Sequence, residues 1–382
     1  SHLPEWLRWN WWRVRYEARV NGPVPSDWRQ SHCMTEIGEG YVWPNVTIVS
    51  DGQRTVIQSA PSERGEVSSF RYYGAPHPVL LPWSRVEAGI DNFVATVMAA
   101  TDAAGVRETN LDRLWRDLAA ERADPAIARF RRFEALLGAD PDELPEEGIT
   151  SRLADAAALG DSAVDELAAA ATGAGIDEVL TLEEIQEIAR SNGQEMRAGD
   201  ALIEVPALAD LTPGETRSAA ELGILAAHEV RRRASLRHGA INDKRLAEIA
   251  GVSHSLLKSA PEKQPISFTL RDDGARIVLR GKRAENRRFD LARLIGDSLI
   301  WGGQPMRPST DARTYRQKAQ RAFAAEFLAP IEAVKARADG DYADDTKEEI
   351  ARHFRVSSMV IDRLLKNNGV IPREADDFAD VA

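Results

Sequence analysis

The stretch that most constrains the fold runs from Arg287 to Ile300 and reads R-R-F-D-L-A-R-L-I-G-D-S-L-I. We expect it to form a helix in which Gly296 and its apolar neighbours serve packing. Arg293 and Asp297 are four residues apart, so on a helix their side chains share one face about one turn apart. A second segment, residues 317–330, reads Q-K-A-Q-R-A-F-A-A-E-F-L-A-P and predicts a partner helix that ends at a proline.

These two segments resemble the motif helices of the ImmA/IrrE family of metallopeptidases, which read R-R-F-T-L-A-H-E-L-G-H-L-L-L and E-x-x-A-N-x-F-A-A-x-L-L-M-P. In that family the H-E-x-x-H histidines bind zinc and the glutamate between them is the general base. The glutamate that opens the second helix is the third ligand. The resemblance covers residues 215–370 and implies a compact α+β domain, with a small sheet against a helical bundle.

The four positions that carry the chemistry of that family are all substituted in this chain. Arg293 and Asp297 stand in the two histidine positions, Leu294 replaces the glutamate, and Gln317 replaces the third ligand. Arginine does not ligate zinc, leucine transfers no proton, and glutamine is a poor neutral ligand. We therefore expect no metal, no cofactor and no peptidase activity at these positions, as in a pseudo-enzyme.

The substitutions also suggest what replaced the ion. Arg293 and Asp297 form an opposite-charge pair on the face that would have pointed at zinc, and Gln317 is expected to hydrogen-bond beside them. The pair is then a polar clamp in place of the metal. The alternative is that this face is solvated, in which case the pair contributes almost nothing to stability.

The domain organisation follows from length and composition. A chain of 382 residues is too long for one ordinary core. We expect a helix-rich α+β fold in three units: a tryptophan-rich α/β unit at 1–90, a mostly helical unit at 91–210, and the ImmA/IrrE-like, zincin-like domain at 211–382. In the first unit, residues 41–49 and 54–59 predict a β-hairpin.

Three further elements are expected from local patterns. Residues 4–20 place aromatic side chains at helical spacing and predict one helix with an aromatic face. Residues 149–171 are rich in alanine and predict another helix. Residues 201–205 predict a short strand.

Residues 346–365 have the pattern of a helix-turn-helix. Ser357 is a suitable N-cap for the second helix. The residues expected in the interior of the helix-turn-helix are Ile350, Ala351, Phe354, Val356, Val360 and Leu364. If the pair binds DNA, the expected contact residues are Arg355, Ser358, Arg363 and Lys366. ImmA/IrrE domains normally end in such a pair, which packs on the peptidase domain, and we favour this packing role.

Charge and cysteine content limit the partners and the compartment. The formal charge of −11 argues against a continuous nucleic-acid-binding surface. The single cysteine, Cys33, excludes an intramolecular disulfide and fits a reducing cytoplasm. No apolar run approaches the roughly 20 residues of a membrane helix, and no signal peptide is recognisable, so we expect a cytoplasmic protein without a membrane partner.

Three functions are compatible with these features. The first is a non-catalytic regulatory or interaction protein of bacterial stress, phage or mobile-element control, which holds a protein or peptide in the former substrate cleft. It follows from the resemblance, because active ImmA/IrrE relatives cleave repressor or antitoxin proteins. The second is a DNA-binding transcriptional regulator that uses the terminal helix pair, and the third is a hydrolase with its site in the N-terminal half.

Overall fold

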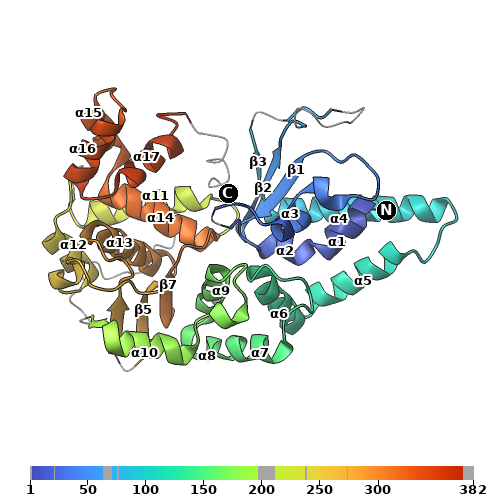
Figure 1. Ribbon diagram of the computed structural model, residues 1–382, viewed down its shortest axis with the longest axis horizontal. Helices are drawn as coiled ribbons and strands as arrows, with labels where there is room; N and C mark the ends of the chain where they lie inside the picture. Colours follow the sequence, from blue (N-terminus) through green and yellow to red (C-terminus); the bar gives the residue numbers. More distant parts are fainter. Residues whose placement is uncertain are drawn as a thin grey trace.

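The computed structural model describes residues 2–20, 22–62, 71–74, 77–196, 211–236, 239–272 and 274–372. Within these residues the fold is helix-rich α+β with two small antiparallel sheets (Figure 1). The first sheet has the order β1-β2-β3, formed by Val46–Ser50, Arg54–Ser59 and Val79–Pro82. The second has the order β4-β6-β5-β7, formed by Gln194–Glu195, Gly274–Val278, Ser267–Asp272 and Met306–Ser309.

The helices fall into three consecutive groups along the chain. The first is α1 to α5: His2–Trp9, Trp11–Tyr16, Ser26–His32, Trp83–Ala103 and Asn110–Ala123. The second is α6 to α10: Pro125–Leu136, Glu146–Ala154, Ala156–Leu159, Asp161–Ala170 and Leu182–Asn192. The third is α11 to α17: Ala219–Arg233, Asp243–Ala250, Ala284–Ile300, Tyr315–Leu328, Ile331–Ala338, Asp344–Phe354 and Ser358–Asn367. Short 3-10 turns cover Met34–Ile37, Ile176–Glu178 and His254–Leu257.

Tryptophan side chains form the centre of the N-terminal part. Trp11 lies edge-on to Trp83 and Trp115, with ring centroids 5.5 and 5.9 Å away. The expected hairpin at 41–49 and 54–59 is confirmed, although its first strand, β1, begins only at Val46. The expected single helix over 4–20 is wrong, because the chain breaks at Asn10 between α1 and α2.

The second sheet separates two layers of helices. Side chains alternate across a strand, so Phe268, Leu270 and Met306 lie on one face, where they join the hydrophobic cluster of α6 to α10. Ile277 lies on the other face and joins the cluster of α11 to α17. The central helices therefore pack on one face of this sheet, and the C-terminal helices pack on the other.

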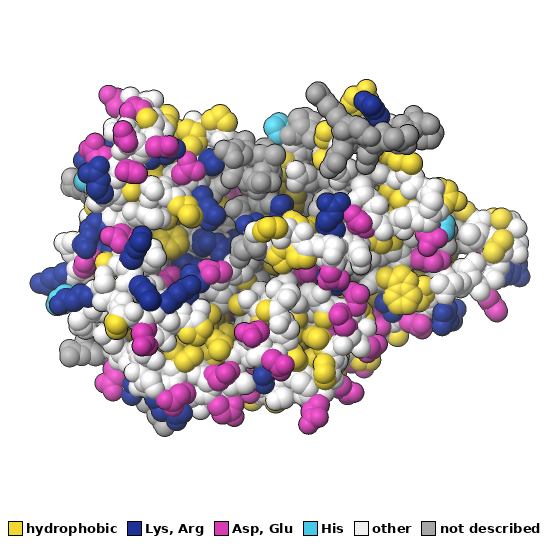
Figure 2. Space-filling model, viewed as in Figure 1, with side chains coloured by type: hydrophobic (Ala, Val, Ile, Leu, Met, Phe, Trp, Pro, Cys, Tyr) yellow, Lys and Arg dark blue, Asp and Glu magenta, His cyan; other side chains and the backbone are white. Residues whose placement is uncertain are grey.

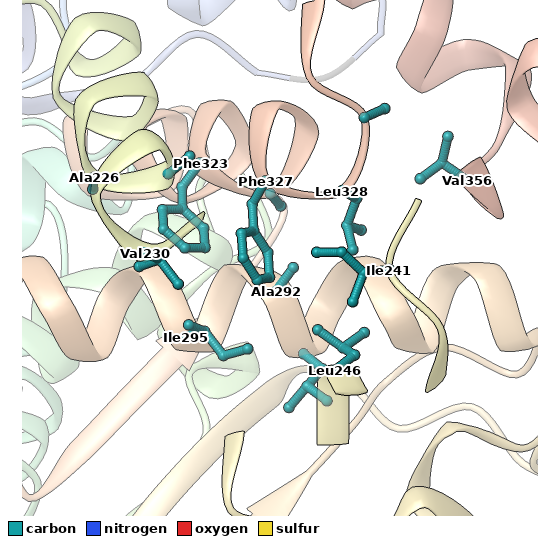
Figure 3. Close-up of a cluster of buried hydrophobic side chains, with 14 of the residues drawn as sticks. Ala226, Val230, Ile241, Leu246, Ala292, Ile295, Phe323, Phe327, Leu328 and Val356 are labelled. Carbon is teal, nitrogen blue, oxygen red and sulfur yellow. The ribbon is translucent and has the colours of Figure 1, made fainter. Parts of the chain in front are cut away.

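The C-terminal core is built around three closely packed helices, α11, α13 and α14 (Figure 3). Phe323 and Phe327 point from α14 toward α13, and their rings stack with centroids 5.2 Å apart. Glycines permit this approach. A Cβ on Gly223 of α11 would lie 2.3 Å from the carbonyl oxygen of Ala319, and one on Gly296 of α13 would lie 2.5 Å from the Phe323 ring.

The hydrophobic clusters join residues across both expected domain boundaries. Helix α4 runs through residue 90, and Trp11 shares a cluster with Leu118 of α5. Leu167 of α9 likewise shares a cluster with Phe268 of the second sheet, on the other side of residue 210. In Figure 1, α4 and α5 extend away from the rest of the chain on the right.

One further expected element is wrong, and another lies outside the residues that the structure describes. Residues 149–171 do not form one helix, because Gly160, with φ of 91°, ends α8 before α9 begins. The expected strand at 201–205 lies outside the described residues. None of the helices in the described part of the chain combines the length and the apolar character needed to cross a membrane.

The close approach of α11 and α14 predicts that Gly223→Ala lowers the free energy of unfolding by about 1–3 kcal/mol, because the added methyl group overpacks a backbone contact. Gly89→Ala in α4 is the matched control. Nothing lies within 4 Å of its added Cβ, so it should stabilise the helix by about 0.5–1 kcal/mol. Urea unfolding of both variants measures the difference. Equal stability of the two variants would contradict the packing described here.

Candidate functional site

The four substituted motif positions are all buried. Arg293, Leu294 and Asp297 lie on α13 and Gln317 lies on the facing helix α14. Their exposed fractions are 3, 3, 0 and 0% respectively. The alternative of a solvated face is therefore wrong, and the polar groups at these positions must find partners inside the protein.

Gln317 connects Arg293 to the end of strand β7. The Nη2 group of Arg293 donates to Gln317 Oε1 at 2.5 Å and to the carbonyl oxygen of Thr310 at 2.6 Å. Gln317 Oε1 also accepts from the Thr310 backbone N–H at 2.9 Å, and its Nε2 donates to the Pro308 carbonyl at 3.2 Å. The expected hydrogen bond between Gln317 and Arg293 is thus confirmed.

Asp297 pairs across the helix interface with α14. Both of its carboxylate oxygens accept from Arg316, Oδ1 from Nε at 2.7 Å and Oδ2 from Nη2 at 2.6 Å. Gln320 Nε2 donates to Oδ1 at 2.7 Å. The expected Arg293–Asp297 clamp is wrong, because the planar guanidinium of Arg316 makes a two-bond contact that an i, i+4 pair with the base first does not match.

Leu294, in the position of the catalytic glutamate, belongs to the hydrophobic cluster of the C-terminal core. It lies beside apolar side chains of α11 and α14 rather than in the polar network. Its side chain has no group that moves a proton. Leu294 therefore contributes to the packing of the C-terminal core.

Helix α9 covers the polar network from the side of the central helices. Arg316 Nη1 donates to Ser162 Oγ at 2.8 Å. The hydroxyl of Thr314, the N-cap of α14, donates to the carboxyl group of Glu166, with oxygen separations of 2.8 and 2.9 Å. Gln317, next to Arg316, is itself fully buried.

Burial dominates the electrostatics of the network. It lowers the pKa of Arg293 to about 10, so the guanidinium stays charged at neutral pH. Burial alone would lower the pKa of Arg316 as well, but the carboxylate of Asp297 raises it above its ordinary value. Burial raises the pKa of Glu166, and the nearby charge of Arg316 only partly opposes this shift.

The residues at this site do not fit a zinc ion. Among the described residues, no group of three or more His, Cys, Asp or Glu side chains is arranged to hold a metal. Asp297 is the only carboxylate at the four motif positions, and both of its oxygens already accept hydrogen bonds. The four motif positions can hold two helices together through hydrogen bonds, but they supply no set of zinc ligands.

The terminal helix pair packs on the same domain. Ile350 and Phe354 of α16 and Leu364 of α17 are buried as expected, whereas the expected Val360 is only partly buried. The other buried residues of α17 are Ile361 and Leu365. Ser357 occupies the N-cap position, although its side chain makes no capping hydrogen bond. Arg288 of α13 donates to the carbonyl oxygen of Arg355 at 3.2 Å and so fixes the turn between the two helices.

The four candidate DNA contacts do not form a common basic face. Arg355 donates to Asp243 at 2.7 Å, and Lys366 lies 3.2 Å from the carboxylate of Asp362. Ser358 and Arg363 are exposed on α17. Figure 2 shows acidic side chains interspersed with basic ones over the region of α15 to α17, at the upper left.

Comparison of the chain with protein-family models, with curated proteins and with solved structures finds no match. The function of this chain is therefore inferred from its residues and their geometry.

Arg316, Gln320 and Glu166 belong to the network but were not expected from the sequence. Arg316 and Gln320 flank Gln317 at helical spacing on α14, and that spacing is a usable signal. Glu166 lies 148 residues from its partner Thr314, so no local pattern connects the two.

Glu166 predicts a pH dependence of stability. Its pKa is raised in the folded protein above the ordinary 4.5, so its contribution is fully present below pH 4.5 and is lost as pH rises through the folded value. Glu166→Gln removes this loss. Relative to the wild type, the variant should gain stability as pH increases from 4.5, measured by urea unfolding at several pH values. A difference that is constant with pH, or that falls as pH rises, would contradict the raised pKa.

Proposed function

We propose that this chain is a non-catalytic regulatory or interaction protein built on a degenerate ImmA/IrrE-type metallopeptidase domain. It binds a protein or peptide partner in the control of bacterial stress responses, phage or mobile elements. The observation that carries this proposal is the substitution and burial of the four motif positions. All four are substituted, and Arg293, Asp297 and Gln317 are closed into hydrogen bonds with their own neighbours.

The framework residues of the motif support the same proposal. Arg287 donates to three backbone carbonyls, those of Leu256, Leu279 and Gly281, at 2.7 to 3.1 Å. Gly296 lets the Phe323 ring pack against α13. A chain that keeps the residues needed for folding but lacks those needed for catalysis is expected to act as a scaffold rather than as an enzyme.

The closed network changes where a partner is expected to bind. The sequence suggested that a peptide occupies the former substrate cleft. The four motif positions are at most 3% exposed, and α9 contacts the neighbouring Arg316 and Thr314 through Ser162 and Glu166. The proposed partner therefore binds outside the network, on the surface of the folded chain.

The two other functions receive less support. Arg355 and Lys366 are engaged by Asp243 and Asp362, which lowers the positive charge available for DNA phosphates. In the N-terminal half, His32 lies 3.0 Å from a carboxylate oxygen of Glu17, but it is fully buried and its second ring nitrogen lies 2.8 Å from the Ile48 carbonyl. That geometry suits a structural histidine better than a catalytic one.

The proposal predicts that the purified full chain does not retain stoichiometric zinc after incubation with the ion and removal of the excess. Elemental analysis of the wild type and of Asp297→Asn should give the same low content. The result follows because Asp297 is already saturated by Arg316 and Gln320. One zinc per chain that disappears in Asp297→Asn would contradict the proposal.

A second measurement tests the interaction itself. The full chain is mixed with repressor and antitoxin proteins of its host, and the mixture is separated by size-exclusion chromatography. The proposal expects one of them to co-elute with the chain in intact form. Zinc-dependent fragments, or co-elution of none of them, would contradict it.

A further inference from the structure

Arg307 is a buried cation without a partner. It lies on strand β7 and is only 6% exposed, and its side chain makes no hydrogen bond or ion pair with any described residue. Its Nε group is fully buried and unsatisfied. The other buried arginines of the described chain each make at least one hydrogen bond to a carboxylate or a carbonyl.

An unpaired guanidinium is unfavourable in such a place. Burying a charge without a counter-charge or hydrogen bonds costs several kcal/mol of stability. Arginine keeps its proton at neutral pH, so it cannot avoid this cost by becoming neutral. The nearest carboxylate in the network, Asp297, is already bonded to Arg316 and Gln320. The described residues therefore supply no hydrogen-bonded anion to Arg307.

The strand register places an exposed arginine on one side of Arg307 and a buried serine on the other. Thr269 of β5 is directly opposite Arg307, so Arg271, two residues further along, is its diagonal neighbour on the same face of the sheet, roughly 7–8 Å away. Arg271 is exposed, and its side chain also makes no hydrogen bond or ion pair with a described residue. Ser309 lies two residues along β7 from Arg307, and its buried hydroxyl has no partner.

Burial and the charges around Arg307 also lower its pKa. Burial lowers the pKa of Arg307, and the positive charge of Arg271 lowers it further. The Asp297 carboxylate opposes this shift, and Arg316 adds to it. The two strands thus hold two positive charges near one another, and the Asp297 carboxylate only partly offsets them.

We infer that this face of the sheet binds the phosphate group of inorganic phosphate or of a small phosphate monoester. Arg307 is the buried anchor and Arg271 is the exposed second cation. A phosphate monoester carries about −1.5 to −2 charges at pH 7, which matches two unpaired guanidinium groups, and arginine binds phosphate oxygens in a two-bond geometry. This inference goes beyond the proposed function and does not depend on it.

The test is thermal unfolding of the full chain in rising concentrations of inorganic phosphate, and separately of a nucleoside monophosphate. Sodium chloride keeps the ionic strength constant. The wild type should unfold at a higher temperature as either probe saturates the site. The probe with the lower saturating concentration identifies the source of the phosphate group. Absence of a saturable rise with both probes would overturn the inference.

Variants locate the site. Arg307→Gln should remove the rise, and Arg271→Gln should shift saturation to a several-fold higher concentration. Arg276→Gln is the matched control, because this arginine of β6 lies 3.9 Å from Glu195 and outside the proposed site. An unchanged rise in Arg307→Gln would overturn the inference. If that variant does not fold, an Arg271→Gln titration identical to that of the wild type would do so.

A third variant tests the missing partner directly. Arg307→Met replaces the unpaired charge with an apolar side chain of similar length. Without phosphate it should unfold at a higher temperature than the wild type, because an uncompensated buried charge has been removed. With saturating phosphate the order should reverse. A lower unfolding temperature of Arg307→Met without phosphate would mean that the chain itself satisfies Arg307, which overturns the inference.

Discussion

The paired hydrogen bonds between Arg316 and Asp297 are the contact on which the C-terminal half of the chain depends. They join α14 to α13 at 2.6 and 2.7 Å in a fully buried setting. A buried ion pair stabilises a fold only if its geometry is good and its remaining polar groups are satisfied. Gln320 satisfies the carboxylate further, and Ser162 accepts from the third guanidinium nitrogen. Through Ser162 the same pair also ties the central helices to this domain.

This network occupies the positions at which the ImmA/IrrE motif would hold zinc. A metal centre cross-links its ligand helices and contributes to folding as well as to chemistry. In the proposed pseudo-peptidase, hydrogen bonds take over the cross-linking role. Arg293 and Gln317 close one side of the interface, and Asp297 with Arg316 closes the other. In that proposal, hydrogen bonds join α13 and α14, and the four motif positions have a structural role.

Part of this site was predictable from the sequence, and the rest was not. The motif spacing predicted α13 and α14 and the contact between Gln317 and Arg293. It did not predict that Asp297 turns to Arg316, because that choice depends on how two helices face each other. Strand β7 was missed because Met306–Ser309 is short and contains a proline. Its buried Arg307 was missed for the same reason, and Glu166 was missed because its partner is distant in sequence.

The structure assigns to the Arg316–Asp297 contact the role of holding α13 and α14 together. A double-mutant cycle with Arg316→Met and Asp297→Leu, followed by urea unfolding, tests it most directly. Each single variant should lose about 3–5 kcal/mol, because it leaves an unpaired buried charge, and the double variant should lose less than the sum of the two. Two single variants within about 0.5 kcal/mol of the wild type, with additive effects, would contradict the claim.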